Sequence, residues 1–262
     1  MLNLKNRLRR TVARVAPPVA GGGVRVLLYH AIDDRDPADV MSLRVPPRQF
    51  AEQMTLLRDE GYAVVPLGAL CNGPDASARA RVAITFDDGY RSQARAAATL
   101  RQFGFPATFF VTPRFLDGVR EARNYSEAWG HFRWDDVATL IEDGFEVGAH
   151  SMTHVDLRRC SAERLDEETA GAKRVLDERL GVEVRSFSYP YGRHDPRVHR
   201  AVERAGYALA CTSRYGSNRV PAPSYTVRRI EVAGRDSLRD FQWKLEGKYD
   251  WVGRWQDFTA TR

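Results

Sequence analysis

Short apolar runs alternate with amphipathic stretches along most of this chain, and this alternation restricts its fold more than any other feature. The apolar runs cover residues 24–28, 82–86, 107–111, 145–149, 186–189 and 208–212. Apolar runs of this length, separated by longer amphipathic stretches, predict buried parallel strands joined by helices. The sequence therefore predicts an α/β fold.

The predicted helices share a stop signal. They are expected over residues 47–60, 91–103, 134–143, 161–180 and 196–205, followed at once by Gly61, Gly104, Gly144, Gly181 and Gly206. Glycine accepts the left-handed backbone that closes many helices. Ser161 is the expected N-cap of the longest helix. Because 262 residues with 43% hydrophobic content can bury one large core, we expect a single domain without a disulfide framework.

Four polar residues follow two of the predicted strands. Asp87 and Asp88 end the run 82–86, and adjacent carboxylates raise each other's proton affinity unless a cation lies on one of them. His150 and His154 follow the run 145–149, at a spacing that lets two imidazoles face one ion. Each pair alone is also explained by a turn or by unrelated histidines. Together they favour a metal site.

A third run completes a resemblance to a known family. The sequence TFDDG at 85–89, HSMTH at 150–154 and YPYG at 189–192 resembles, in this order, the first three motifs of the polysaccharide deacetylases, carbohydrate esterase family four. The resemblance covers roughly residues 24 to 235. It implies a distorted (β/α) barrel of about seven strands and a metal-dependent hydrolase that removes N-acetyl groups from amino sugars.

The resemblance also implies a role for each matching residue. Asp88, His150 and His154 match the metal triad of the family, and Asp87 matches its general base. The backbone N–H of Tyr191 would assist at the oxyanion. Zinc is the expected divalent metal, although cobalt, nickel and iron accept the same ligands.

The general acid departs from the family pattern. The usual final motif is Leu-x-His near the C-terminal end, but no histidine follows His199. His30 ends the first predicted strand, a placement that resembles the circularly permuted deacetylases of exopolysaccharide biosynthesis, in which the N-terminal strand supplies the last strand of the barrel. We therefore expect His30 to be the acid. The alternative is a histidine hydrogen-bonded in the barrel rim.

A second departure concerns the orientation of the base. Ser188 stands where many relatives carry an arginine that pairs with the base. The adjacent residues Arg228 and Arg229 suggest the hypothesis that one of them approaches Asp87 from another strand. A solvated or structural arginine pair explains the same residues equally well.

Some segments outside the three motifs also carry expectations. The aromatic-rich connection 125–134 suits stacking on sugar rings or packing against the barrel. His194 and Asp195 are interpreted as the cap of the helix that follows them. The expected divisions of the chain are a basic leader and glycine hinge over 1–23, a deacetylase-like catalytic barrel over 24–235, and a C-terminal helix and tail over 236–262.

The leader is basic and amphipathic. Leu4, Leu8, Val12 and Val15 fall at helical spacing among five basic residues, and no long apolar segment follows. This pattern predicts either a helix lying on an anionic membrane surface or a frayed, solvated leader. Without a signal-peptide core, we expect a cytoplasmic location, with the inner membrane face as the alternative. No motif indicates nucleic-acid binding, despite the net charge of +6.

Three functions remain open at this stage. The leading one is a deacetylase acting on an N-acetylated glycan or on a lipid-linked or nucleotide-linked sugar. A second keeps the metal site but hydrolyses a formamido group or a cyclic amide of a small intracellular substrate. The third is a glycan-binding protein without activity, which the complete set of ligands and base disfavours.

Overall fold

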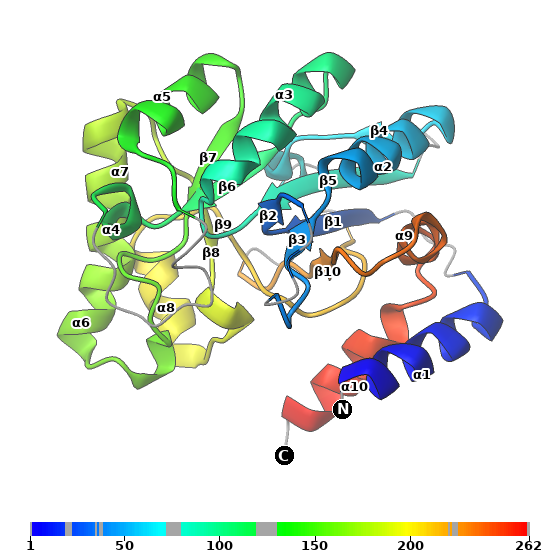
Figure 1. Ribbon diagram of the computed structural model, residues 1–262. Coiled ribbons are helices and arrows are strands. Elements are labelled where there is room, and N and C mark those ends of the chain that lie inside the picture. Colours follow the sequence, from blue (N-terminus) through cyan, green and yellow to red (C-terminus); the bar gives the residue numbers. More distant parts are fainter. Residues whose placement is uncertain are drawn as a thin grey trace.

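A curved parallel sheet forms the centre of the protein, and helices cover its outer face (Figure 1). The computed structural model describes residues 2–18, 23–34, 36, 39–71, 80–118, 130–219, 221 and 225–260. The sheet contains β1 (Val24–Tyr29), β4 (Ala63–Val64), β5 (Arg81–Phe86), β6 (Thr108–Val111), β7 (Glu146–Ala149), β8 (Ser186–Ser188), β9 (Leu209–Cys211) and β10 (Ile230–Glu231), in the order β10-β1-β5-β6-β7-β8-β9 with β4 beside β5. A separate pair joins β2 (Ala31–Ile32) to β3 (Arg44–Val45).

The helices agree closely with the sequence-based expectation. They are α1 (Leu2–Val15), α2 (Pro47–Asp59), α3 (Ala94–Phe103), α4 (Pro113–Leu116), α5 (Trp134–Glu142), α6 (Ala162–Asp166), α7 (Ala172–Leu180), α8 (Pro196–Arg204), α9 (Leu238–Leu245) and α10 (Asp250–Ala260). All five predicted terminating glycines have φ between 64° and 85°. Ser161 caps α6 as expected, because its hydroxyl accepts a hydrogen bond from the backbone N–H of Arg164. The predicted helix 161–180 differs in one respect, since a π-helical turn over Glu167–Gly171 divides it.

The N-terminal strand has the place that a permuted barrel requires. β1 lies between β10 and β5, in parallel with both. The chain near its C-terminal end links the two edges of the sheet, because Val227 pairs with Cys211 of β9 while Ile230 pairs with Leu27 of β1. The seven strands from β10 to β9 therefore curl into the expected distorted barrel in a single domain, and β4 is a short additional strand beside β5.

Aromatic side chains fill the space between the sheet and α2. The rings of Phe86 and Phe109 stack with their centroids 4.7 Å apart, and Tyr29 stacks on Phe86 at 5.4 Å. Phe50 of α2 packs edge-on against Tyr29 at 5.2 Å. All four side chains are fully buried. Truncating one of these rings would lower the free energy of unfolding by about 3–5 kcal/mol. This packing therefore holds the ends of β1 and β5 firmly in place.

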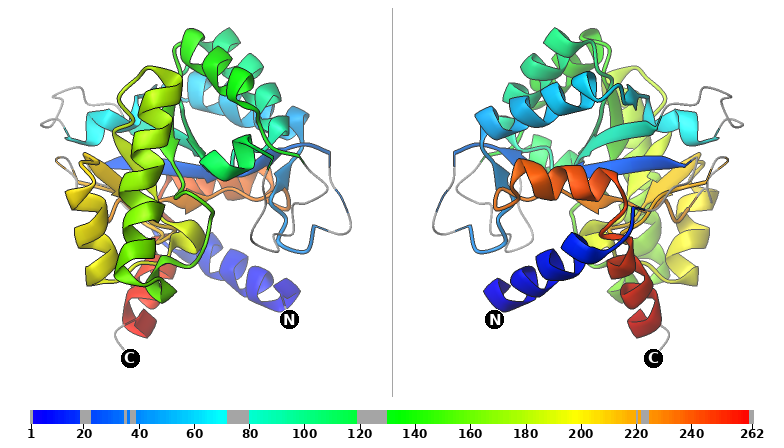
Figure 2. Two further views of the ribbon diagram at one scale, coloured as in Figure 1. Left: turned by 90° about the vertical axis from the view of Figure 1, so that its left-hand side faces the viewer. Right: turned by 90° about the vertical axis from the view of Figure 1, so that its right-hand side faces the viewer.

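The N-terminal segment is helical and lies against the C-terminal part of the chain (Figures 1 and 2). Ala13 is fully buried, and Arg10 contacts the carboxylate of Asp240 at 2.7 Å. The expectation of a frayed, solvated leader is therefore wrong for this helix. Gly21 and Gly22 of the expected hinge lie outside the described residues. Among the described helices, none has the length and apolarity to span a membrane.

Candidate active site

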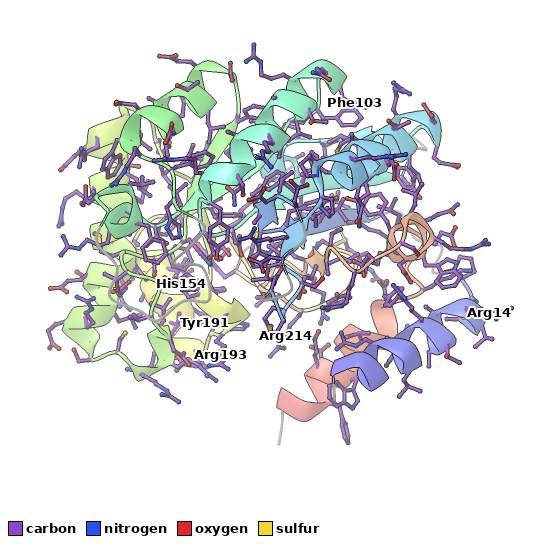
Figure 3. The ribbon with its side chains drawn as sticks, in the orientation of Figure 1. Arg14, Phe103, His154, Tyr191, Arg193 and Arg214 are labelled. Carbon is purple, nitrogen blue, oxygen red and sulfur yellow. The ribbon has the colours of Figure 1, made fainter. Side chains whose placement is uncertain are left out.

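The carboxyl ends of three strands converge on one cavity. β5 leads into Asp87 and Asp88, β7 leads into His150, and β1 leads into His30. These residues and Tyr191 line a cavity of about 360 Å³. Figure 3 shows His154 and Tyr191 close together at this edge of the sheet, where their ring centroids are 4.8 Å apart.

Three of the predicted site residues form a compact ligand cluster. Oδ1 of Asp88 lies 3.3 Å from Nε2 of His150 and 3.2 Å from Nε2 of His154. One ligand atom from each residue lies within 4.8 Å of the other two, and all three side chains are buried. The structure thus brings together the residues that the motifs predicted as metal ligands.

The chemistry of this cluster fits a divalent cation. Nδ1 of His150 lies 2.8 Å from the carbonyl oxygen of Ser188, which can only accept a hydrogen bond, so Nδ1 carries the proton. If His150 is neutral, its Nε2 directs a lone pair toward the Asp88 carboxylate, and these two electron-rich atoms repel each other unless a cation lies between them. If His150 is protonated, Nε2 instead donates a hydrogen bond to Asp88 and takes the place of the cation. One carboxylate oxygen and two imidazole nitrogens are a donor set that zinc accepts.

The backbone of the site is left-handed at several residues other than glycine. The φ angles are 72° at Asp88, 59° at Ser151, 61° at His154 and 60° at Tyr191. Each such conformation costs on the order of 1–3 kcal/mol and persists only where neighbouring contacts hold it. The Ser151 hydroxyl supplies one such contact, because it accepts a 2.9 Å hydrogen bond from the N–H of His154.

Glu168 supports the loop between the two histidines, and sequence reasoning missed it. Its carboxylate is fully buried in the π-helical turn and accepts hydrogen bonds from the N–H of Thr153 at 2.9 Å and the hydroxyl of Thr153 at 2.5 Å. Arg164 pairs with it at 2.9 Å. Glu168 is one of three consecutive acidic residues, 166–168, in a helical pattern, and nothing local distinguishes it from its two neighbours.

Arg229 holds the predicted base. Its two terminal nitrogens donate to the two carboxylate oxygens of Asp87, each at 2.7 Å, and its Nε donates to the carbonyl of Thr212. The hydroxyl of Ser188 donates to Asp87 at 3.1 Å. Arg228 instead pairs with Asp257 at 2.7 Å. Of the two arginines proposed from the sequence, Arg229 is thus the one that approaches the base.

These contacts decide the charge of both carboxylates. Burial alone would raise the pKa of Asp87, but the charges of Arg229 and His150 outweigh it and leave that pKa below its usual value. Burial likewise opposes ionisation of Asp88, yet its hydrogen bonds with His150 and His154 hold its pKa well below the usual range. Both carboxyl groups are therefore ionised at neutral pH.

His30 lies across the same cavity on the end of β1. The fully buried side chain of Gln93 donates to the backbone carbonyls of His30, at 2.9 Å, and Asp87, at 2.6 Å, so it ties the ends of β1 and β5 together. Nδ1 of His30 is buried and has no hydrogen-bond partner among the described residues.

Comparison with known proteins identifies the family. The sequence profile described as "Polysaccharide deacetylase" matches residues 75–210, which is half of the chain. This chain belongs to the polysaccharide deacetylase family. His30, which follows β1, and Arg229, which precedes β10, lie outside the matched residues of this deacetylase. In the sheet, β1 lies between β5 and β10.

Individual relatives agree with the family assignment. YxkH of Bacillus subtilis strain 168, whose name places it among polysaccharide deacetylases, is 26% identical over 212 residues, 79% of this chain and 71% of its own. The peptidoglycan-N-acetylglucosamine deacetylase of Bacillus cereus is 31% identical over 130 residues, 48% of this chain and 53% of its own. The structure of the Streptococcus pyogenes deacetylase PplD shares the fold, with a TM-score of 0.75, 23% identity and coverage of 87% of this chain and 99% of that one.

The remaining predicted features of this deacetylase have structural roles where they are described. Asp195 caps α8, because its carboxylate accepts hydrogen bonds from the N–H groups of Arg197 and Val198, as expected. In the aromatic connection, residues 125–129 lie outside the described residues. Trp134 packs under the guanidinium of Arg179 at 4.0 Å, which favours the packing interpretation for the end of that segment.

Proposed function

We propose that this polysaccharide deacetylase removes N-acetyl groups from the amino sugars of a glycan or glycan precursor, using a divalent cation, zinc, held by Asp88, His150 and His154. One observation carries the proposal: two buried imidazole nitrogens converge on one oxygen of Asp88, directly beside an ionised Asp87. The Bacillus cereus relative named for N-acetylglucosamine supports the substrate class. When bound, the cation supplies a positive charge that acidifies water and polarises the acetyl carbonyl.

Asp87 serves as the general base. It accepts a proton from the attacking water as the water oxygen bonds to the acyl carbon. The paired hydrogen bonds from Arg229 and the hydroxyl of Ser188 fix the orientation of the carboxylate. Arg229 and then His150 outweigh the effect of burial and lower the pKa of Asp87, which keeps the base ionised but makes it a weaker proton acceptor. The pairing with Arg229 thus orients Asp87 and at the same time makes it less basic.

His30 and Tyr191 complete the reaction. His30, as an imidazolium, donates a proton to the sugar nitrogen when the C–N bond breaks, so that the amine and acetate leave as stable products. The backbone N–H of Tyr191 donates a hydrogen bond to the oxygen that gains negative charge in the transition state. Gln93 keeps the acid and base strands in register through its two carbonyl contacts.

Acetate release from N-acetylglucosamine oligomers tests this proposal. Protein loaded with zinc should release acetate, and chelated protein should not. Asp87→Asn and His30→Ala should each lower the rate by about 10²–10⁴-fold, while His199→Ala, outside the cavity, should leave it unchanged. Release that survives chelation would refute the metal-dependent mechanism. Tight zinc binding without acetate release would instead assign the site to a formamido group or a cyclic amide.

A further inference from the structure

Two residues of the apolar stripe of α1 face solvent rather than the protein. Leu8 is 62% exposed and Val15 is 79% exposed, although both belong to the apolar positions of this amphipathic helix. A helix that packs on a globular domain normally buries these positions. Here Leu8 and Val15 lie on the outer side of the helix, while Val12 of the same stripe is half-buried.

A polar contact holds α1 in this orientation. Arg10 pairs with Asp240 at 2.7 Å and donates to the backbone carbonyl of Arg235 at 2.7 Å, and Ala13 is buried beside them. The face that docks on the protein is thus the one that carries Arg10 and Ala13. Leu8 and Val15 lie on the opposite face of the helix, and in the described part of the chain both remain exposed.

The charge of α1 is entirely positive. Its sequence, LNLKNRLRRTVARV, contains five basic residues and no acidic residue. Arg14 is exposed near its C-terminal end and is labelled in Figure 3, where it extends away from the barrel. A helix that combines exposed apolar residues with a net positive charge complements an anionic lipid surface.

Helix α10 extends from the same side of the barrel. Both views in Figure 2 show α1 and α10 projecting below the sheet. On α10, Trp255 is 56% exposed and Phe258 is 59% exposed, three residues apart on one face. The acidic residues of α10 are neutralised on its other side, since Asp250 pairs with Arg25 and Asp257 pairs with Arg228. Tryptophan at such a surface favours the boundary between lipid headgroups and acyl chains.

We propose that α1 and α10 together bind the surface of a bilayer that contains anionic lipids. Leu8, Val15, Trp255 and Phe258 enter the boundary region, and Arg14 meets the headgroup phosphates. A second copy of this chain is a poorer occupant, because a symmetric dimer would bring two uniformly basic α1 helices together. The proposal is independent of the chemistry at the cavity, which lies at the strand ends.

Vesicle flotation of the full chain tests the proposal. The protein should float with phosphatidylcholine vesicles that contain phosphatidylglycerol, float less with pure phosphatidylcholine, and bind more weakly as salt rises. Arg14→Glu should weaken binding about fivefold or more. Arg48→Glu is the matched control, because Arg48 is 92% exposed on α2 and its replacement changes the net charge equally. Leu8→Asp combined with Val15→Asp should weaken binding about tenfold or more.

Three outcomes would overturn the proposal. These are no flotation with either vesicle, equal flotation with both at every salt concentration, or equal losses for Arg14→Glu and Arg48→Glu. Light scattering adds a separate arm: a dimer without vesicle binding, dissociated by Leu8→Asp, would assign this face to a second copy. Unfolding midpoints of all variants should match that of the parent protein, because each replaced side chain is exposed.

Discussion

The guanidinium of Arg229 meets Asp87 where neither side chain has substantial contact with solvent, with exposed fractions of 0% and 5%. Both hydrogen bonds of the pair measure 2.7 Å. Breaking such a buried pair costs about 3–5 kcal/mol, because the remaining charge loses its partner. Lysine would keep the charge but lose the planar fork, so Arg229→Lys separates the effect of charge from that of geometry.

We expect Arg229→Lys to lower kcat by about 100-fold, because Asp87 would no longer be held in one orientation. Loss of the paired hydrogen bonds should also raise the pKa of Asp87, so the acidic limb of the kcat/KM profile should move to higher pH. Arg228→Lys, the matched control at the Asp257 contact, should leave both unchanged. A lower rate with an unmoved acidic limb would indicate that Arg229 is only structural, provided that thermal unfolding shows a folded variant.

The choice between Arg228 and Arg229 could not be made from the sequence, for a physical reason. Side chains alternate between the two faces of an extended segment, so one of two neighbours faces the cavity. Which of the two does so depends on how the segment pairs with parts of the chain that are distant in sequence. Here it is set by the hydrogen bond from the N–H of Arg229 to the carbonyl of Arg214 and by the pairing of Ile230 with Leu27. Neither contact leaves a local pattern.

At the scale of single elements, the helix expected over 161–180 is the clearest departure. Its apolar periodicity correctly predicted both ends, at Ser161 and Gly181. The π-helical turn Glu167–Gly171 inserts an additional residue into one turn, and π-turns often occur at functional sites. This turn carries Glu168 in contact with Thr153, next to His154, one of the proposed ligands. The interrupted helix thereby becomes part of the support for the site.

Glu168→Gln should lower zinc affinity by about 10–100-fold, because one acceptor for the Thr153 loop is replaced by a donor. Zinc affinity can be measured by competition with a chromogenic chelator. Glu167→Gln is the matched control, since the Glu167 side chain is 64% exposed and contacts Arg164 on the helix surface. Equal affinities for the two variants would exclude the supporting role.

The segment that begins α8 should make stability depend on pH. His194 stacks on His199 with ring centroids 4.6 Å apart, and burial, followed by the charge of His199, lowers the pKa of His194 from 6.5 to about 4. Because the unfolded chain then binds this proton more readily, the contribution to stability is present above pH 6.5 and is lost as pH falls toward 4. The unfolding midpoint should fall over this range, and less steeply in His194→Gln. Identical slopes would contradict the assignment.

At the scale of the whole molecule, the strands and the cavity at their ends could be predicted because apolar runs and strand-end motifs are local signals. The place of the first strand came instead from the resemblance to the permuted deacetylases. The position of α1 could not be predicted: its sequence allowed a helix on a membrane surface or a frayed leader, whereas the Arg10–Asp240 pair, which joins residues far apart in sequence, holds the helix against the protein. Hydrophobic periodicity identifies the apolar face of a helix, but it does not show which face an ion pair with a residue distant in sequence will bring against the protein.

Metal binding should stabilise the whole domain, because the ligands come from β5 and the segment after β7, both within the central sheet. Zinc at 100 times its Kd would add about 2.7 kcal/mol to the free energy of unfolding, which corresponds to a rise of about 5–10 °C in Tm. Scanning calorimetry with and without a chelator measures this shift. His154→Ala should abolish it and His199→Ala should retain it; a shift that persists in His154→Ala would place the zinc elsewhere.

The proposed acid, His30, follows β1. Arg229, which pairs with the proposed base Asp87, lies in the segment that links β9 to β1. The ribosome therefore makes His30 well before Arg229, whatever else the chain contains. A nascent chain that has not yet released Arg229 from the exit tunnel would hold Asp87 without its counter-charge and the sheet without its closing link. The proposed base would gain its partner only after that segment has left the ribosome.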